Sequence, residues 1–185
     1  IQFNQALELD PSRDFNPQTK ANQINQALPM LQQGAKFADS GKIPQAIQAY
    51  KKAQELDPTL EIYAPSWNYL CWNAAIYNQV TAEVLDACDQ AVKLQPEDAE
   101  IHNNRGVARA LTGDFIGAIE DFQMYVDVTV NEQEKSLRQN WIDSLNIGQN
   151  PFTENLLQQI RESQQSPWLI TPTDSKQNST SKPQE

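Results

Sequence analysis

Histidine, cysteine and glycine are scarce in this chain of 185 residues, and their scarcity excludes several kinds of active site. His102 is the single histidine, so one chain can form neither a histidine-based catalytic triad nor a metal site with several histidine ligands. The six glycines form no phosphate-binding loop, because each fits a helix crossing or a turn. Two cysteines provide too few ligands for zinc and too little evidence to assign a cellular compartment. We therefore expect no enzyme activity, no metal and no cofactor, and we interpret His102 as a surface residue in the first turn of a helix.

Positive charge and long apolar runs are also missing. The chain has 14 Lys and Arg residues against 24 Asp and Glu residues, which gives a net charge of −10. Binding to nucleic acid or to an anionic membrane surface needs clustered Lys and Arg, and a membrane span needs about 20 apolar residues in a row. The sequence therefore argues against nucleic-acid partners and membrane insertion. Its acidic residues are interpreted as solvated helix faces rather than as catalytic groups.

An internal repeat is the strongest positive feature. Residues 34–58 have the pattern of two helices joined at Gly41, and the second helix ends at Asp57-Pro58, since proline cannot continue a helix. Its apolar residues recur at i, i+3, i+4 and i+7, the spacing of one buried helix face. Two further copies of this stripe follow, the last of them 34 residues after the middle one. The stripes are Ala46, Ile47, Tyr50, Ala53 and Leu56; Val84, Leu85, Cys88, Ala91 and Leu94; and Ala118, Ile119 and Phe122.

A helix–turn–helix repeat of about 34 residues with this pattern resembles the tetratricopeptide repeat family, over roughly Met30 to Tyr125. The resemblance implies an all-α, right-handed superhelical solenoid, with repeats at about 29–60, 65–98 and 99–130. We expect Gly34 and Gly106 at the closest approach of paired helices. Residues 131–162 are expected to form capping helices, because the open end of a solenoid must be covered.

The two ends of the chain are assigned differently. Residues 1–11 match the end of a repeat's second helix, so they are interpreted as the remnant of a preceding repeat; a short amphipathic N-terminal helix is the alternative. Residues 12–28 are assigned to a linker and a helix that begins at Asn16, and Pro29 is expected to interrupt that helix, either as a kink or as the start of a new helix. Residues 163–185 are polar and are predicted to be disordered, with Trp168-Leu169-Ile170 as the one candidate contact in that tail.

A narrower resemblance concerns three segments: Leu70-Cys71-Trp72, Arg105 to Asp114, and Trp141 to Thr153. They are similar to a tetratricopeptide module found at the C-terminal end of bacterial, often cyanobacterial, multidomain proteins. Two functions remain open on this basis. The first is a scaffold that binds a protein or peptide in its concave groove. The second is a regulatory or oligomerising module of a larger enzyme or signalling protein whose catalytic part precedes it.

Cys71 and Cys88 lie on the two paired helices of the second repeat, on stripes that face inward. A disulfide between them would link the hairpin whose turn has no glycine. Two separate buried thiols are the alternative, because free cysteine often packs as a small apolar residue. The pairing requires Cα atoms within about 7 Å of each other.

Arg105 and Arg109 occupy positions where the repeat pattern has apolar residues, one helical turn apart on the packed side of a helix. A buried guanidinium must be paired. We expect an internal ion-pair network, with Asp121 as one partner; a site for an anion or a peptide carboxylate is the alternative. The acidic neighbours of these arginines favour the ion pairs.

The predicted partner-binding groove consists of first-helix residues that do not pack on the second helix. Trp72 is its expected anchor, since aromatic residues dominate interface energetics. The alternatives are that Trp72 belongs to the core, or that the capping helices or a neighbouring copy of the chain fill the groove. The groove residues are Leu31, Ala35 and Ala38; Asn68, Trp72 and Ile76; and Asn103, Val107, Ala110 and Leu111.

Overall fold

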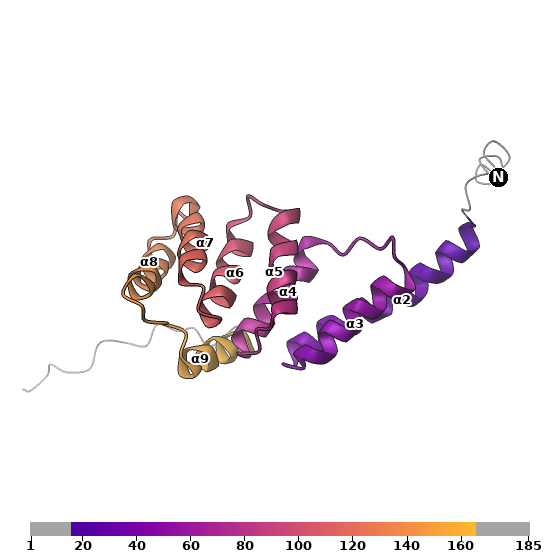
Figure 1. Ribbon diagram of the computed structural model, residues 1–185, viewed down its shortest axis with the longest axis horizontal. Helices are drawn as coiled ribbons and strands as arrows, with labels where there is room; N and C mark the ends of the chain where they lie inside the picture. Colours follow the sequence, from indigo (N-terminus) through magenta and orange to yellow (C-terminus); the bar gives the residue numbers. More distant parts are fainter. Residues whose placement is uncertain (1–15, 166–185) are drawn as a thin grey trace, which may run out of the picture.

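The computed structural model describes residues 16–165, where all regular secondary structure is helical and there is no strand. Successive helices form antiparallel hairpins that stack side by side, and this arrangement confirms the predicted all-α helical solenoid (Figure 1). The hairpins are α2/α3, α4/α5 and α6/α7; α8 packs on α7, and α9 returns across α4. The helices are α2 (Pro17–Asp39), α3 (Ile43–Leu56), α4 (Ala64–Ile76), α5 (Ala82–Leu94), α6 (Ala99–Leu111), α7 (Phe115–Val128), α8 (Glu132–Asn146) and α9 (Glu154–Gln165).

The helix boundaries follow from local chemistry. The side chain of Asn16 accepts hydrogen bonds from the first backbone N–H groups of α2, and Asp98 does the same for α6. The α2–α3 and α6–α7 turns each contain a glycine with positive φ, Gly41 at 68° and Gly113 at 88°. In the α4–α5 turn, Asn78 adopts this conformation instead, at φ 52°. Asparagine tolerates the left-handed region better than most residues, so the turn forms without glycine.

Gly34 and Gly106 lie where paired helices approach most closely. A Cβ atom on Gly34 would be 2.7 Å from Cδ1 of Tyr50, and one on Gly106 would be 2.8 Å from Cε1 of Phe122. The aromatic ring of each second helix therefore packs directly on the backbone of the first. A larger side chain at either position would have to displace a buried ring.

The first helix differs from the prediction at Pro29. The expectation of a new helix start there is wrong, because α2 runs without a break from Pro17 to Asp39 with Pro29 inside it. Pro29 is exposed, so water can reach the carbonyl of Asn25 that loses its helical hydrogen bond. The helix assigned to residues 12–28 is thus the beginning of the first repeat's own helix.

The helices after the third repeat close the end of the stack. Trp141 of α8 packs against Phe122, with ring centroids 5.4 Å apart, and Phe152 lies 4.8 Å from Trp141. Leu157 of α9 is fully buried beside this cluster. The helix continues to Gln165, slightly beyond the predicted boundary at 162. The predictions for residues 1–15, and for the tail from 166 onward, fall outside the described residues.

Candidate partner-binding cleft

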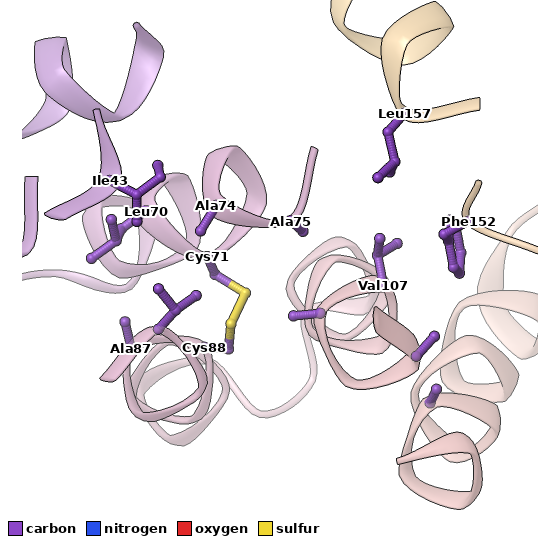
Figure 2. Close-up of a cluster of buried hydrophobic side chains, with 14 of the residues drawn as sticks. Ile43, Leu70, Cys71, Ala74, Ala75, Ala87, Cys88, Val107, Phe152 and Leu157 are labelled. Atoms are coloured by element: carbon purple, nitrogen blue, oxygen red, sulfur yellow. A yellow bond between two sulfur atoms is a disulfide. The ribbon is translucent and has the colours of Figure 1, made fainter. Parts of the chain in front are cut away.

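Much of the predicted groove is covered, because α8 and α9 fold over it. Val107 is completely buried, and Figure 2 shows Leu157 and Phe152 pointing toward it. Asn103 is buried and accepts a hydrogen bond of 3.0 Å from Nε of Arg138 in α8. The expectation that these residues face an open groove is therefore wrong.

The same covering extends to the second repeat and to the end of α6. Ile76 is buried, and its carbonyl accepts a hydrogen bond from Arg161 of α9. Ala110 is also buried, and its carbonyl accepts a bond of 2.9 Å from Asn150. Leu111 is only partly buried, but it packs against the core. Of the alternatives considered, filling by the capping helices describes this part of the groove.

The second-repeat residues Asn68 and Trp72 are partly buried. Trp72 packs against the hydrophobic core and so does not form an isolated aromatic anchor. The side-chain oxygen of Asn68 accepts a hydrogen bond of 3.1 Å from Asn104, which links α4 to α6. Asn68 therefore contributes to the packing of the second repeat on the third, and Trp72 contributes to the core.

An open cleft remains between α2 and the beginning of α4. Its volume is about 750 Å³. The α2 wall is a single stripe of the helix, and two predicted groove residues, Leu31 and Ala35, lie on it. Ala38 continues this helix but is completely buried. The α2 wall comprises Lys20, Ile24, Leu28, Leu31 and Ala35; the opposite wall includes Leu60, Tyr63, Pro65 and Tyr69.

The cleft exists because the first and second repeats are connected by an unusually long segment. Residues 57–63 separate α3 from α4, whereas residues 95–98 suffice between α5 and α6. Lys20 holds this segment against α2, with its Nζ 2.5 and 2.6 Å from the two carboxylate oxygens of Asp57. The hydrogen bond from Lys20 is the main cause of a lowered pKa at Asp57, aided by bonds from Thr59. The pair thus secures one end of the cleft.

Aromatic residues form the other side and the base of the cleft. Tyr63 is 71% exposed and Tyr69 is 38% exposed, and the hydroxyl of Tyr69 donates a hydrogen bond of 2.8 Å to Asp39. Desolvation and the neighbouring Asp39 raise the pKa of Tyr69 to about 12. Tyr50 lines the base of the cleft, and its hydroxyl donates a hydrogen bond of 3.2 Å to the carbonyl of Ser66. Burial raises the pKa of Tyr50 to about 12. Tyr50 and Tyr69 are therefore neutral at physiological pH.

Sequence reasoning missed the aromatic wall of this cleft. Residues Thr59 to Pro65 were treated only as extra length between repeats, although Tyr63 in this segment is a large apolar side chain outside any helical stripe. The sequence did contain a signal for this wall: an aromatic residue lies in a connection that is longer than the repeat requires. Such a residue has no position in the repeat core, so it remains free to line a surface.

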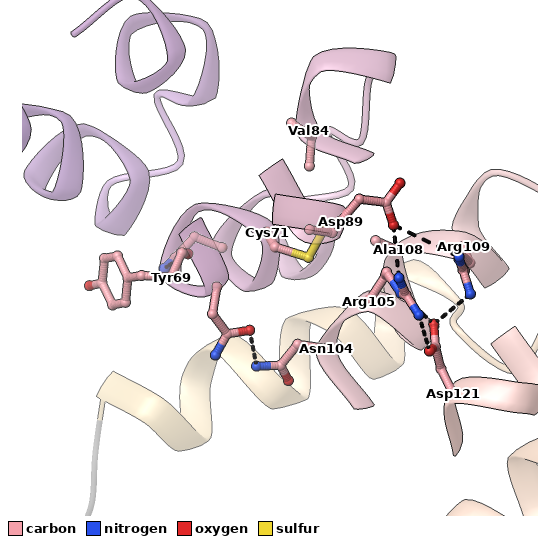
Figure 3. Close-up of a disulfide and its surroundings, with 12 residues drawn as sticks. Tyr69, Cys71, Val84, Asp89, Asn104, Arg105, Ala108, Arg109 and Asp121 are labelled. Atoms are coloured by element: carbon pink, nitrogen blue, oxygen red, sulfur yellow. Dashed lines mark hydrogen bonds and ion pairs between the residues drawn. A yellow bond between two sulfur atoms is a disulfide. The ribbon is translucent and has the colours of Figure 1, made fainter. Parts of the chain in front are cut away.

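A second polar cluster joins α5, α6 and α7, and Figure 3 shows it beside the disulfide. Asp121 is 1% exposed and accepts hydrogen bonds from Arg105 at 2.7 and 2.9 Å and from Arg109 at 3.0 Å. Arg105 also donates to Asp89 at 2.9 Å. Desolvation lowers the pKa of Arg105, but the hydrogen bonds and negative charges of Asp121 and Asp89 outweigh this effect. The net result is a raised pKa, so the guanidinium stays charged. The acidic side chains occupy the arginines' donors, as an internal ion-pair network requires.

His102 contradicts our expectation of a surface position. Its ring is buried, with Nδ1 2.7 Å from Asp121 and Nε2 2.9 Å from the carbonyl of Pro96. The packing of α6 on α7 places it there, because the first turn of α6 lies opposite Asp121. His102 therefore belongs to the same structural network as the two arginines.

Cys71 and Cys88 form a disulfide, with an S–S distance of 2.01 Å and Cα atoms 5.0 Å apart (Figure 3). It joins α4 to α5 across the only one of the three hairpin turns that has no glycine. Both residues are buried within the core. The bond therefore links the two helices that form the centre of the stack.

Neither metal chemistry nor membrane crossing has structural support in residues 16–165. No three side chains of the His, Cys, Asp or Glu type gather there into a possible metal site. No helix in this part of the chain combines the length and the apolar character needed to span a membrane.

The cleft offers an apolar surface with a few polar groups at its ends, an arrangement suited to binding.

Two curated proteins are similar to part of the chain. Tetratricopeptide repeat protein 36 of Bos taurus is 31% identical over 110 residues, which cover 59% of this chain and 50% of that protein. The protein of the same name from Mus musculus is 28% identical over 130 residues, covering 70% of this chain and 61% of that protein. The chain thus spans between half and two thirds of the length of these relatives. No protein-family model matches it.

These names agree with the paired helices, and together they support a tetratricopeptide-like family. Both relatives are mammalian, so the resemblance to a bacterial multidomain module stays a prediction.

Proposed function

We propose that this chain is a non-catalytic scaffold that binds a protein or peptide in the cleft between α2 and α4. The observation that carries the proposal is the exposure of large apolar side chains along this cleft, including Leu28 at 43% and Tyr63 at 71%. Apolar surface gathered in a concave site commonly marks an interaction site. The similarity to tetratricopeptide repeat proteins supports protein interaction as the class of function.

The dimensions of the cleft suit a short peptide. The stripe from Lys20 to Ala35 extends about 22 Å at 1.5 Å per helical residue. An extended peptide of about seven residues covers the same distance. The chain's net charge of −10 disfavours a strongly acidic ligand. We therefore expect a ligand with two or three large apolar residues and a neutral or basic character.

The test is selection of binding peptides from a random library against the folded chain. We expect peptides enriched in aromatic and aliphatic residues, whose binding is weakened at least tenfold by Tyr63→Ser. Ile147→Ser is the matched control, because Ile147 is 70% exposed but lies at the end of α8. Equal loss of binding in both variants, or no binding peptide at all, would refute the proposed site.

A second candidate function is supported by the outer surface of α7. Ile116, Met124 and Val128 are spaced on one helix face and are 75%, 37% and 62% exposed. Such a stripe fits an oligomerising module of a larger protein, in line with the narrower resemblance to C-terminal bacterial modules. Light scattering at increasing concentration tests this function: association that Ile116→Glu abolishes would support it, and a monomer at all concentrations would refute it.

A further inference from the structure

We propose that the segment following α9 binds in the α2–α4 cleft through Trp168-Leu169-Ile170 and competes there with the partner. The inference rests on the proposed function only for the identity of the competing ligand. Binding of the segment itself is argued from the cleft and from the position of α9. The chain would then regulate access to its own binding site.

The first observation is that contacts through Tyr77 and Asp39 connect α9 to the cleft. Arg161 donates a hydrogen bond to the carbonyl of Ile76, and its guanidinium lies 5.5 Å from the ring centroid of Tyr77. The hydroxyl of Tyr77 donates to the carbonyl of Asp39 at 2.9 Å. The side chain of Asp39 in turn accepts the hydrogen bond from Tyr69. A continuous series of contacts thus connects the last turns of α9 to a residue that lines the cleft.

The direction of α9 agrees with these contacts. Figure 1 shows the helix crossing beside α4 toward the α2/α3 hairpin. In Figure 3 the pale yellow helix ends on the side of the view where the Tyr69 ring lies. The C-terminal end of α9 itself is therefore directed toward the first repeat.

The chain length is sufficient to reach the cleft. Four residues of α9 after Arg161 advance the chain by about 6 Å, at 1.5 Å per residue. Three more residues lead to Trp168 and span at most about 10 Å when extended. Trp168 can therefore lie up to about 16 Å from Arg161. Tyr69 lies eight residues before Tyr77, which is about 12 Å along α4, so the segment is long enough to reach the Tyr69 end of the cleft.

The chemistry of the segment matches that of the cleft. Trp168, Leu169 and Ile170 are three consecutive large apolar residues in an otherwise polar sequence. Pro167 and Pro172 flank them, and proline disfavours helical geometry in the residue before it. A short apolar segment of this composition is complementary to an open cleft whose exposed side chains include Leu28, Tyr63 and Tyr69.

The experiment is ¹⁹F NMR of the full chain labelled with fluorotryptophan, which gives one resonance for each of the four tryptophans. Trp168→Phe assigns the relevant resonance, and a peptide of residues 165–175 gives its position when free. We expect the Trp168 resonance of the full chain to differ from that of the peptide. The double variant Leu28→Ser/Tyr63→Ser should return it to the free position, while Ile147→Ser should leave it unchanged. Circular dichroism establishes that each variant is folded.

Three results would overturn the inference: a Trp168 resonance at the free position, insensitivity to the double variant, or a position that depends on protein concentration. The last result would show that a second copy supplies the segment. Competition is measured separately, with the library-selected peptides and Trp168→Ser. Release of an intramolecular competitor should raise their affinity about 2- to 10-fold. If those peptides bind the cleft while Trp168 is free, only this inference fails; if Trp168 is bound and no peptide is found, only the proposed function fails.

Discussion

Replacing Gly106 with leucine tests the helix crossing on which the third repeat depends. The Cβ atom of any larger residue would lie 2.8 Å from Cε1 of Phe122 and 3.1 Å from its Cδ1 and Cζ. The Phe122 ring is fully buried and is held by Trp141 and Phe152, so it has no free space to enter. The clash must therefore be relieved by movement of the helices themselves.

The magnitude follows from two opposing terms. Overpacking a core costs about 1–3 kcal/mol, and we expect the upper end because the ring is enclosed. Leucine favours the helical conformation over glycine by nearly 1 kcal/mol. The net loss of about 2 kcal/mol should lower the thermal midpoint by about 4–8 °C for a domain of this size.

The assay is thermal and urea unfolding followed by circular dichroism, in a double-mutant cycle with Phe122→Leu. In that background a smaller side chain faces Gly106, so Gly106→Leu should cost less than half as much. An unchanged or raised midpoint in the single variant would refute the close crossing. Additive effects of the two substitutions would show that Phe122 is not the side chain that Gly106 accommodates.

Three further perturbations have defined outcomes. Reduction of the Cys71–Cys88 disulfide, which closes a loop of 17 residues, should lower the free energy of unfolding by about 3 kcal/mol in the chain-entropy model; equal urea midpoints with and without reductant would contradict this. Asp121→Asn weakens the partner of two partly buried guanidinium groups and should cost about 3 kcal/mol, the lower end of the range for a broken buried ion pair, measured by urea unfolding; a loss below about 1 kcal/mol would show that the network is not needed. The pKa of Asp57 is lower in the folded chain than its ordinary value of 3.8, so its ionised form stabilises the fold above that pH, and this stabilisation is lost as the pH falls through the lowered pKa. Lys20→Met should reduce the steepness of the acid-side decline in unfolding free energy, and an identical pH profile in both proteins would refute the assignment.

Local periodicity in the sequence was enough to predict the elements and their pairing. The apolar stripes specify which helix faces are buried, and Gly34 and Gly106 mark the crossings because only glycine permits a ring to pack on the backbone. Arg105 and Arg109 required carboxylate partners for a similarly local reason, since their positions face the core. Each of these predictions depends on residues within one repeat or on the spacing between neighbouring repeats.

Contacts between distant parts of the chain decided the rest. The hydrogen bond from Arg161 to Ile76 joins residues 85 positions apart, and no repeat pattern specifies it. This return of α9 buries much of the predicted groove, and the packing of α6 on α7 buries His102. The open cleft arises where Lys20 holds the long α3–α4 connection against α2. Side-chain periodicity predicts that a helix face will be buried, but only the folded chain determines which distant segment covers it and which face is left open.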